Sequence, residues 1–176
     1  MIHDENTNNK LLVLFVLEKL EMPVSEDLLL EMCSIDNNWI PYLYCKQVIN
    51  EIIQSGLATK ISSQSSRTPL VSLTSDGRIC LAHFYNDIPL STQDEVKEFV
   101  KQHRINYRKK QEFISDYFKN NDGSYTVSLK IMEVTQTLID LKLVVATRAI
   151  ATSIAANWNE KAPEVYRMLY EQLVEN

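Results

Sequence analysis

Apolar residues recur at helical spacing through the first third of the chain and predict three helices. The first covers about residues 7–21, where apolar positions fall on most sides of the helix. Pro23 lies just beyond its end, and Ser25 is the expected N-cap of a second helix that runs to about Cys33. A polar turn over residues 34–38 precedes the third helix, which we expect over about residues 40–55.

The pattern after Gly56 predicts a hairpin and a fourth helix. Residues 57–61 and 70–73 are strand-like and flank a polar loop, and Thr74-Ser75-Asp76-Gly77 opens a helix to about Asn86. A helix followed directly by a two-stranded hairpin is the core of a winged helix-turn-helix. We therefore expect a winged-helix domain over residues 1–90.

The second half of the chain changes from helical period to strand period. A connecting helix is expected over residues 91–111, followed by strands near 113–118, 125–131 and 139–145. Asp122-Gly123 between the first two strands favours a tight turn. Two closing helices are predicted, one over residues 148–158 and one that begins at Pro163. The expected fold class is α+β: a winged helix, then a domain over 112–176 in which a three-stranded antiparallel sheet packs with two helices.

Charge is distributed unevenly along the chain of 176 residues, whose net charge is −5. Residues 1–90 hold 6 basic and 11 acidic residues, 6 − 11 = −5, whereas residues 91–176 hold 12 of each. DNA-binding domains are usually basic, because neutralising phosphates supplies much of their affinity. The acidic first half therefore counts against tight non-specific DNA binding.

Other features of the sequence indicate a cytoplasmic protein without catalytic chemistry. The three Cys show no CxxC spacing, and the longest apolar run near the N-terminus, residues 11–17, is far shorter than the roughly 20 residues of a membrane span. The three His are scattered, and no phosphate-binding Gly loop, GxSxG or HExxH motif occurs. We expect no enzyme, no cofactor, no metal site and no membrane partner.

The order of motifs resembles winged-helix regulators of the MarR and PadR kind. The resemblance rests on Gln54-Ser55-Gly56-Leu57, the polar hairpin and Leu73-Thr74-Ser75-Asp76-Gly77. Over nearly its full length the chain is similar to a narrower family of unknown function from Gram-positive bacteria with an N-terminal winged helix. Segments 10–17, 125–131, 137–143 and Asn157-Trp158 carry that likeness. The resemblance implies a winged-helix fold and a regulatory role, without a ligand or an established chemistry.

In a winged helix the third helix would enter the DNA major groove, and the hairpin would contact the backbone or minor groove. Side chains suited to bases or phosphates lie on this helix and hairpin, namely Tyr42, Tyr44, Lys46, Gln47, Asn50, Lys60 and Arg67. Glu51 and the absence of Arg on this helix favour instead a solvated or protein-binding face. Both interpretations remain open at this point.

A second basic feature is a stripe at helical spacing on the connecting helix, formed by Lys97, Lys101, Arg104 and Arg108. The stripe could flank DNA, pair with an acidic patch on a second subunit or lie in solvent. The hypothesis that best unites these features is a homodimeric regulator that binds double-stranded DNA. Its rival is a winged-helix module that binds proteins, and a less favoured third is a small-molecule sensor built on the C-terminal sheet.

Overall fold

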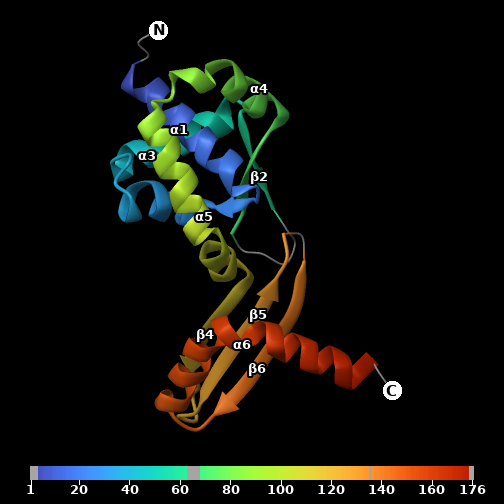
Figure 1. The fold of residues 1–176 in the computed structure, drawn as a ribbon. Coiled ribbons are helices and arrows are strands. Elements are labelled where there is room, and N and C mark those ends of the chain that lie inside the picture. The colour runs from blue at the N-terminus through green and yellow to red at the C-terminus, as the bar shows by residue number, and fades with distance from the viewer. Residues whose placement is uncertain (1–3, 63–67, 135, 175–176) are drawn as a thin grey trace. The chain divides into compact units, whose positions relative to one another are not determined.

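A computed structural model describes residues 4–62, 68–134 and 136–174 and divides the chain into two compact units (Figure 1). The boundary falls inside helix α5 (Leu90–Glu112), after Tyr107. The fold is α+β, with six α-helices and two three-stranded antiparallel sheets in the described residues.

Helix α1 (Glu5–Leu20) is the centre of the N-terminal unit. Asp4 caps its start by accepting a hydrogen bond from the Thr7 amide at 2.7 Å. Every residue from 11 to 17 is buried, as expected for a helix that is apolar on all sides. The helix ends at Glu21, whose φ of 54° places it in the left-handed region.

The next helices are shorter and less regular than the sequence predicted. Strand β1 (Val24–Ser25) leads into α2 (Glu26–Leu30), and Ser25 caps α2 through the Leu28 amide, as predicted. The helix continues as a π-helical segment, η1 (Glu31–Asp36), where a turn was expected from residue 34. After this π-helical segment, the Cys33 carbonyl accepts hydrogen bonds from the backbone amides of both Trp39 and Ile40.

The remaining elements of this unit form a small sheet and two further helices. They are α3 (Tyr42–Gln54), β2 (Ala58–Ile61), β3 (Leu70–Leu73), α4 (Ser75–Phe84), the short 3₁₀ helix η2 (Tyr85–Asp87) and α5. The sheet order is β1-β3-β2, so β3 lies in the middle. Strand β1 is only two residues long and was not predicted, because so short a segment has no periodicity.

Helix α4 is fastened to the end of α3 by Thr74 and Gly77. The Thr74 hydroxyl donates to the Gly56 and Leu57 carbonyls at 2.7 and 2.9 Å and accepts from the Gly77 amide. A Cβ on Gly77 would lie 2.0 Å from the Leu57 oxygen, so only glycine fits there. The residues Thr74 and Gly77, part of the motif on which the family resemblance rests, therefore pack the start of α4 against the end of α3.

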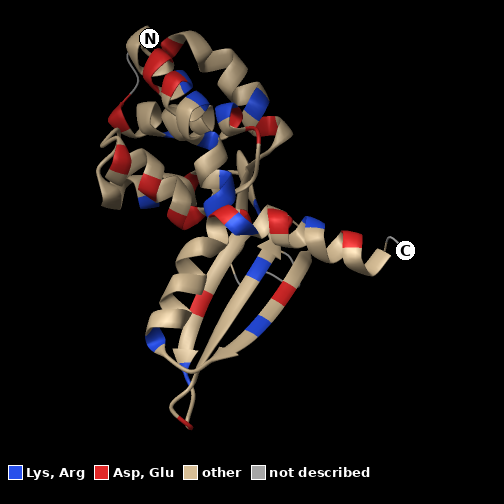
Figure 2. Ribbon diagram, turned by 60° about the horizontal axis from the view of Figure 1, so that its bottom comes forward, with Lys and Arg blue, Asp and Glu red and all other residues tan. Residues whose placement is uncertain are grey.

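The C-terminal unit is built on a meander of β4 (Phe113–Lys119), β5 (Tyr125–Met132) and β6 (Thr137–Val145) in the order β4-β5-β6, as predicted. Gly123, with φ of 89°, allows the tight turn between β4 and β5. Val127, Leu129 and Ile131 of β5 face the core, and the other face of the sheet carries charged residues such as the Lys130–Asp140 pair, 3.5 Å apart (Figure 2).

One helix, α6 (Arg148–Val174), covers the apolar face of this sheet, so the prediction of two closing helices was wrong. Pro163 lies inside α6 and removes a single intrahelical hydrogen bond, the one to the Asn159 carbonyl. Trp158, Ala162 and Val165 continue one apolar stripe across the proline, and their packing on the sheet keeps the helix continuous. A proline break expected from sequence was therefore overridden by tertiary packing.

Two further findings concern membrane-spanning helices and the cysteines. No helix in the described part of the chain is long and apolar enough to cross a membrane. Cys33 and Cys45 are buried and free, while Cys80 is partly exposed.

Candidate nucleic-acid interface

Helix α3 is held against the core by one face and exposes the other. Cys45, Val48, Ile49 and Ile52 form the buried face. The helix start is positioned by Trp39, whose ring meets Phe99 edge-on at 5.6 Å and whose indole N–H donates to Glu95 at 3.3 Å. These contacts tie the segment before α3 to α5, and the buried face of α3 turns its other face to solvent.

The outer face contains five of the residues predicted to contact DNA. They lie exposed on α3 and are Tyr42, Tyr44, Lys46, Gln47 and Asn50. Tyr42 and Tyr44 are 47% and 60% exposed, so they pack little of their rings against the unit. Lys46 has no acidic partner among the described residues and is free to contact a phosphate.

The outer face includes a residue that the sequence interpretation missed, Leu43. It is 77% exposed, one of the most exposed apolar side chains of the described chain. Leu43, Gln47, Asn50 and Gln54 follow at spacings of four, three and four, so they form the central line of the exposed face. The spacing can be recognised in the sequence. Leu43 was left out of the predicted DNA contacts because it is apolar.

Glu51, the residue that argued against DNA, is neutralised within the N-terminal unit. Its carboxylate lies 2.7 Å from the Lys10 ammonium and accepts hydrogen bonds from Gln47 at 2.7 Å and Asn6 at 3.0 Å. These contacts, Lys10 first, lower the pKa of Glu51 from 4.5 to about 2. The only acidic residue of α3 therefore presents no uncompensated charge, although Gln47 is partly committed to holding it.

The hairpin residues predicted to contact DNA are placed less favourably. Lys60 lies exposed on β2, and its ammonium is 3.4 Å from the carboxylate of the partly buried Glu26. To bind a phosphate, Lys60 would have to leave this ion pair. Arg67 falls outside the described residues. The structure therefore gathers the predicted α3 residues on one face and leaves Lys60 on a separate element.

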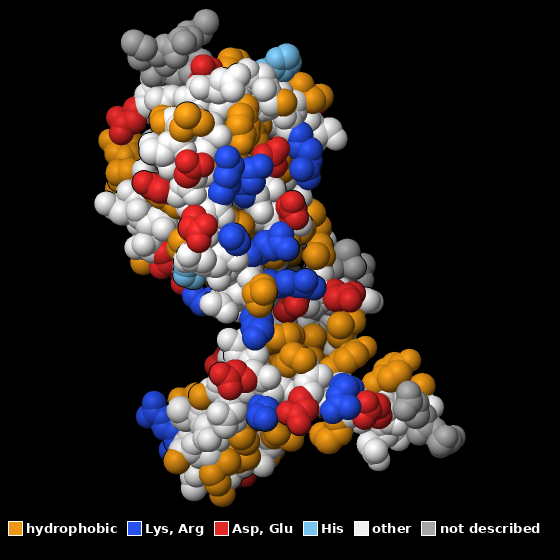
Figure 3. All heavy atoms as spheres, in the orientation of Figure 1, with side chains coloured by type: hydrophobic (Ala, Val, Ile, Leu, Met, Phe, Trp, Pro, Cys, Tyr) orange, Lys and Arg blue, Asp and Glu red, His pale blue; other side chains and the backbone are white. Residues whose placement is uncertain are grey.

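The basic stripe of α5 divides between the two units. Lys97, Lys101 and Arg104 belong to the N-terminal unit, where cations gather on one face along α5 (Figure 3). Arg108 lies beyond the unit boundary and pairs with Glu112, one turn along the same helix, at 2.7 Å. The four residues thus share a helix without forming a single site.

The end of α6 exposes an apolar surface that the sequence interpretation assigned to covering the sheet. Beyond Val165 the helix no longer contacts the sheet core (Figure 1). The exposed apolar side chains of this segment are Tyr166, Met168, Tyr170, Leu173 and Val174. Leu173 is 80% exposed, and the rings of Tyr166 and Tyr170 stack 6.4 Å apart. The last turns of α6 therefore expose most of their apolar side chains.

No group of three metal-ligating side chains occurs in residues 4–62, 68–134 and 136–174. The His103 ring stacks on the Phe99 ring, with 4.4 Å between their centres, whereas His83 is exposed.

Comparisons with known proteins give one match. The sequence model of a family described as a domain of unknown function, DUF4364, matches residues 9–173. No curated protein and no solved structure matches the chain.

Proposed function

The chain belongs to the DUF4364 family, a family of unknown function, and we propose that it is a winged-helix transcriptional regulator that binds double-stranded DNA as a homodimer. The observation that carries the proposal is the outer face of α3, which is exposed, polar and free of uncompensated negative charge. The order α1-β1-α2-α3-β2-β3, with the sheet order β1-β3-β2, supports a winged helix.

In this proposal α3 enters the major groove. Gln47 and Asn50 carry amides that can pair with adenine, and Leu43 offers an apolar contact for a thymine methyl. Lys46 and Tyr44, on either side of that line, contact phosphates. With only one Lys on α3, the helix discriminates among sequences more than it holds DNA, and Lys60 and Arg67 add backbone contacts.

The homodimer supplies the second α3 helix and a second half-site. The last turns of α6 support this part of the proposal, because most of their apolar side chains are exposed and lie outside the core of the C-terminal unit. Residues Tyr166, Leu169, Tyr170 and Leu173 recur at helical spacing on one side of α6. The Arg167–Glu171 ion pair lies on the other side, so two copies can meet through an uncharged seam.

The experiment is a selection of bound fragments from sheared bacterial genomic DNA at about 50 mM salt, followed by mobility shifts of the recovered fragments at rising salt. The proposal predicts recovery of specific fragments and weaker binding as salt rises. A variant with Gln47→Ala and Asn50→Ala should lose the preference for those fragments and keep its folded stability. Failure to retain any fragment at low salt would refute the proposal.

A second candidate function is a winged-helix module that binds another protein. The exposure of Leu43, beside the half-exposed Tyr42, favours it, since apolar and aromatic side chains anchor protein interfaces. Under this alternative no DNA fragment is retained at low salt. The substitution Leu43→Asp would then abolish partner binding without changing the stability of the chain.

A further inference from the structure

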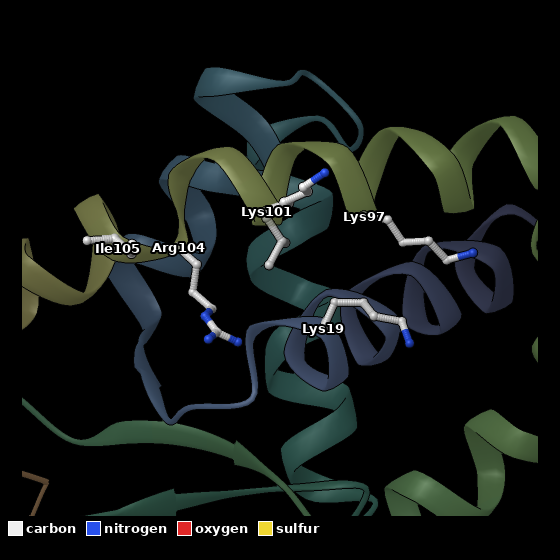
Figure 4. A pocket seen from close by; sticks show the side chains of 6 residues that line it. Lys19, Lys97, Lys101, Arg104 and Ile105 are labelled. Carbon is white, nitrogen blue, oxygen red and sulfur yellow. The ribbon is translucent and has the colours of Figure 1, made fainter.

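A groove lies between α1 and α5 in the N-terminal unit, and neither the core nor the α3 face accounts for it. Its cavity volume is about 360 Å³, and it is lined by Lys19, Lys97, Val100, Lys101, Arg104 and Ile105 (Figure 4). Lys97, Lys101 and Arg104 follow at spacings of four and three, so they share one side of α5. Lys19 comes from the last turn of α1, on the opposite wall.

The charges around this groove do not cancel. Lys19 lies 3.1 Å from Glu18, Lys97 is 3.9 Å from Asp94, and Arg104 is 3.0 Å from Glu21. Lys101 has no acidic partner in the described part of the chain. Four cations therefore face three carboxylates, and the groove keeps one excess positive charge.

Two of these ion pairs are easily exchanged for a ligand. The side chains of Asp94 and Glu21 are 78% and 74% exposed, and ion pairs at the surface are held weakly. In Figure 4, Arg104 extends from α5 toward the end of α1, and the Lys101 ammonium is turned away at the rim. The Lys19 side chain runs along α1, and its ammonium lies 5.2 Å from the centre of the Phe15 ring. With no carboxylate holding it, the Lys101 side chain is free to swing toward a bound anion.

The groove also has an apolar part. Val100 is 5% exposed and forms the floor, while Ile105 is 67% exposed at one end. A volume of 360 Å³ falls within the roughly 300–1,000 Å³ of small-molecule sites. Cations beside an apolar floor suit a ligand that joins an anionic group to an apolar or aromatic one.

We propose that the α1–α5 groove binds a phosphorylated small molecule with an aromatic or apolar moiety. Arg104 and Lys101 bind its phosphate groups, since a guanidinium matches phosphate oxygens in pairs and an ammonium acts as a point charge, and Lys19 adds positive charge on the opposite wall. Val100 and Ile105 contact its apolar moiety. The apolar residues Val100 and Ile105 favour a small ligand with an apolar moiety over a DNA backbone, which would use the cations alone. This site is separate from α3 and does not depend on the DNA-binding proposal.

The test is calorimetric titration of the full chain, without DNA, with inorganic pyrophosphate and with ADP at low salt. ADP should bind more tightly than pyrophosphate, because the base adds contact with Val100 and Ile105. The double variant Lys101→Gln, Arg104→Gln should weaken ADP binding at least about ten-fold, the scale expected for losing charged hydrogen bonds. The matched control Lys161→Gln, Arg167→Gln removes two exposed cations from α6 and should leave the affinity unchanged.

Three results would overturn the inference: no binding of either probe at millimolar concentration, equal weakening in the control, or equal affinities for ADP and pyrophosphate. A fourth would reassign the groove. If neither probe binds and the double variant weakens DNA binding, the groove is a contact for the DNA backbone. The variant Asn50→Ala separates the two proposals, because it should impair DNA binding and leave ADP binding intact.

Discussion

Replacing Gly77 with Ala tests the close packing of the start of α4 against the residues that follow α3. Gly77 lies in the first turn of α4, where a Gly→Ala change would by itself stabilise the helix by about 1 kcal/mol. Here the new Cβ would lie 2.0 Å from the Leu57 oxygen and 2.8 Å from Leu73 Cδ1. The packing around Gly77 therefore predicts that Gly77→Ala lowers the stability of the protein, whereas helix propensity alone predicts that it raises it.

The magnitude follows from what must move. Helix α4 has to retreat by roughly 1 Å, since overpacked side chains do not compress. That shift strains the hydrogen bonds from the Thr74 amide and hydroxyl to the Leu57 carbonyl, which are 3.2 and 2.9 Å long. Overpacking costs about 1–3 kcal/mol and each lost hydrogen bond about 1 kcal/mol, so Gly77→Ala should destabilise the N-terminal unit by about 3 kcal/mol.

The assay is urea denaturation followed by tryptophan fluorescence in a Trp158→Phe background. Trp39 is then the only Trp and reports on the N-terminal unit alone. The control is Ser75→Ala, an exposed position in the same turn, which should change the free energy of unfolding by less than about 0.5 kcal/mol. Equal or greater stability of Gly77→Ala would refute the packing argument.

Three further predictions concern the core, the α3 ion pair and the dimer. Trp158 is buried in the C-terminal unit and donates its indole N–H to the Lys130 carbonyl at 3.0 Å, so Trp158→Ala should cost about 3–5 kcal/mol in urea denaturation followed by near-ultraviolet circular dichroism. A cost below about 1 kcal/mol would contradict this packing. In an NMR titration the Glu51 carboxyl should titrate near pH 2, and Lys10→Gln should raise its pKa toward 4.5. Because the folded pKa is the lower one, the ion pair stabilises the protein fully above pH 4.5 and is lost as the pH falls through about 2, and a Glu51 pKa unmoved by Lys10→Gln would count against the contact. Sedimentation equilibrium should show a dimer that Tyr170→Ser with Leu173→Ser converts to monomer, while Met168→Ser, on the other side of α6, leaves it intact; a monomeric wild type would exclude the seam.

The sequence predicted those elements whose pattern is set locally. The meander β4-β5-β6 follows from alternating apolar residues and from Asp122-Gly123, which permits the positive φ of the turn. The cap at Ser25 was also predicted, because a hydroxyl just before an apolar helical run is a common N-cap. These features depend on neighbours within a few residues.

The features that the sequence did not reveal depend on distant contacts. Pro163 was expected to begin a helix, yet the packing of Trp158 and Val165 on the sheet carries α6 through it. Glu51 was counted as a free charge, but Lys10, 41 positions earlier in the sequence, neutralises it. The groove between α1 and α5 required Lys19 and Arg104 to be brought together across the fold.

The central claim is that the outer face of α3 binds DNA. Its most direct test is fluorescence anisotropy of a recovered DNA fragment across a range of salt concentrations, for the wild type, Lys46→Gln, Asn50→Ala and the control Asn157→Ala on α6. Lys46→Gln should reduce the slope of log affinity against log salt by about 1. Asn50→Ala should weaken binding to the fragment by about 1–3 kcal/mol and leave binding to a scrambled sequence nearly unchanged. If all four proteins bind with the same affinity and the same slope, α3 does not contact DNA.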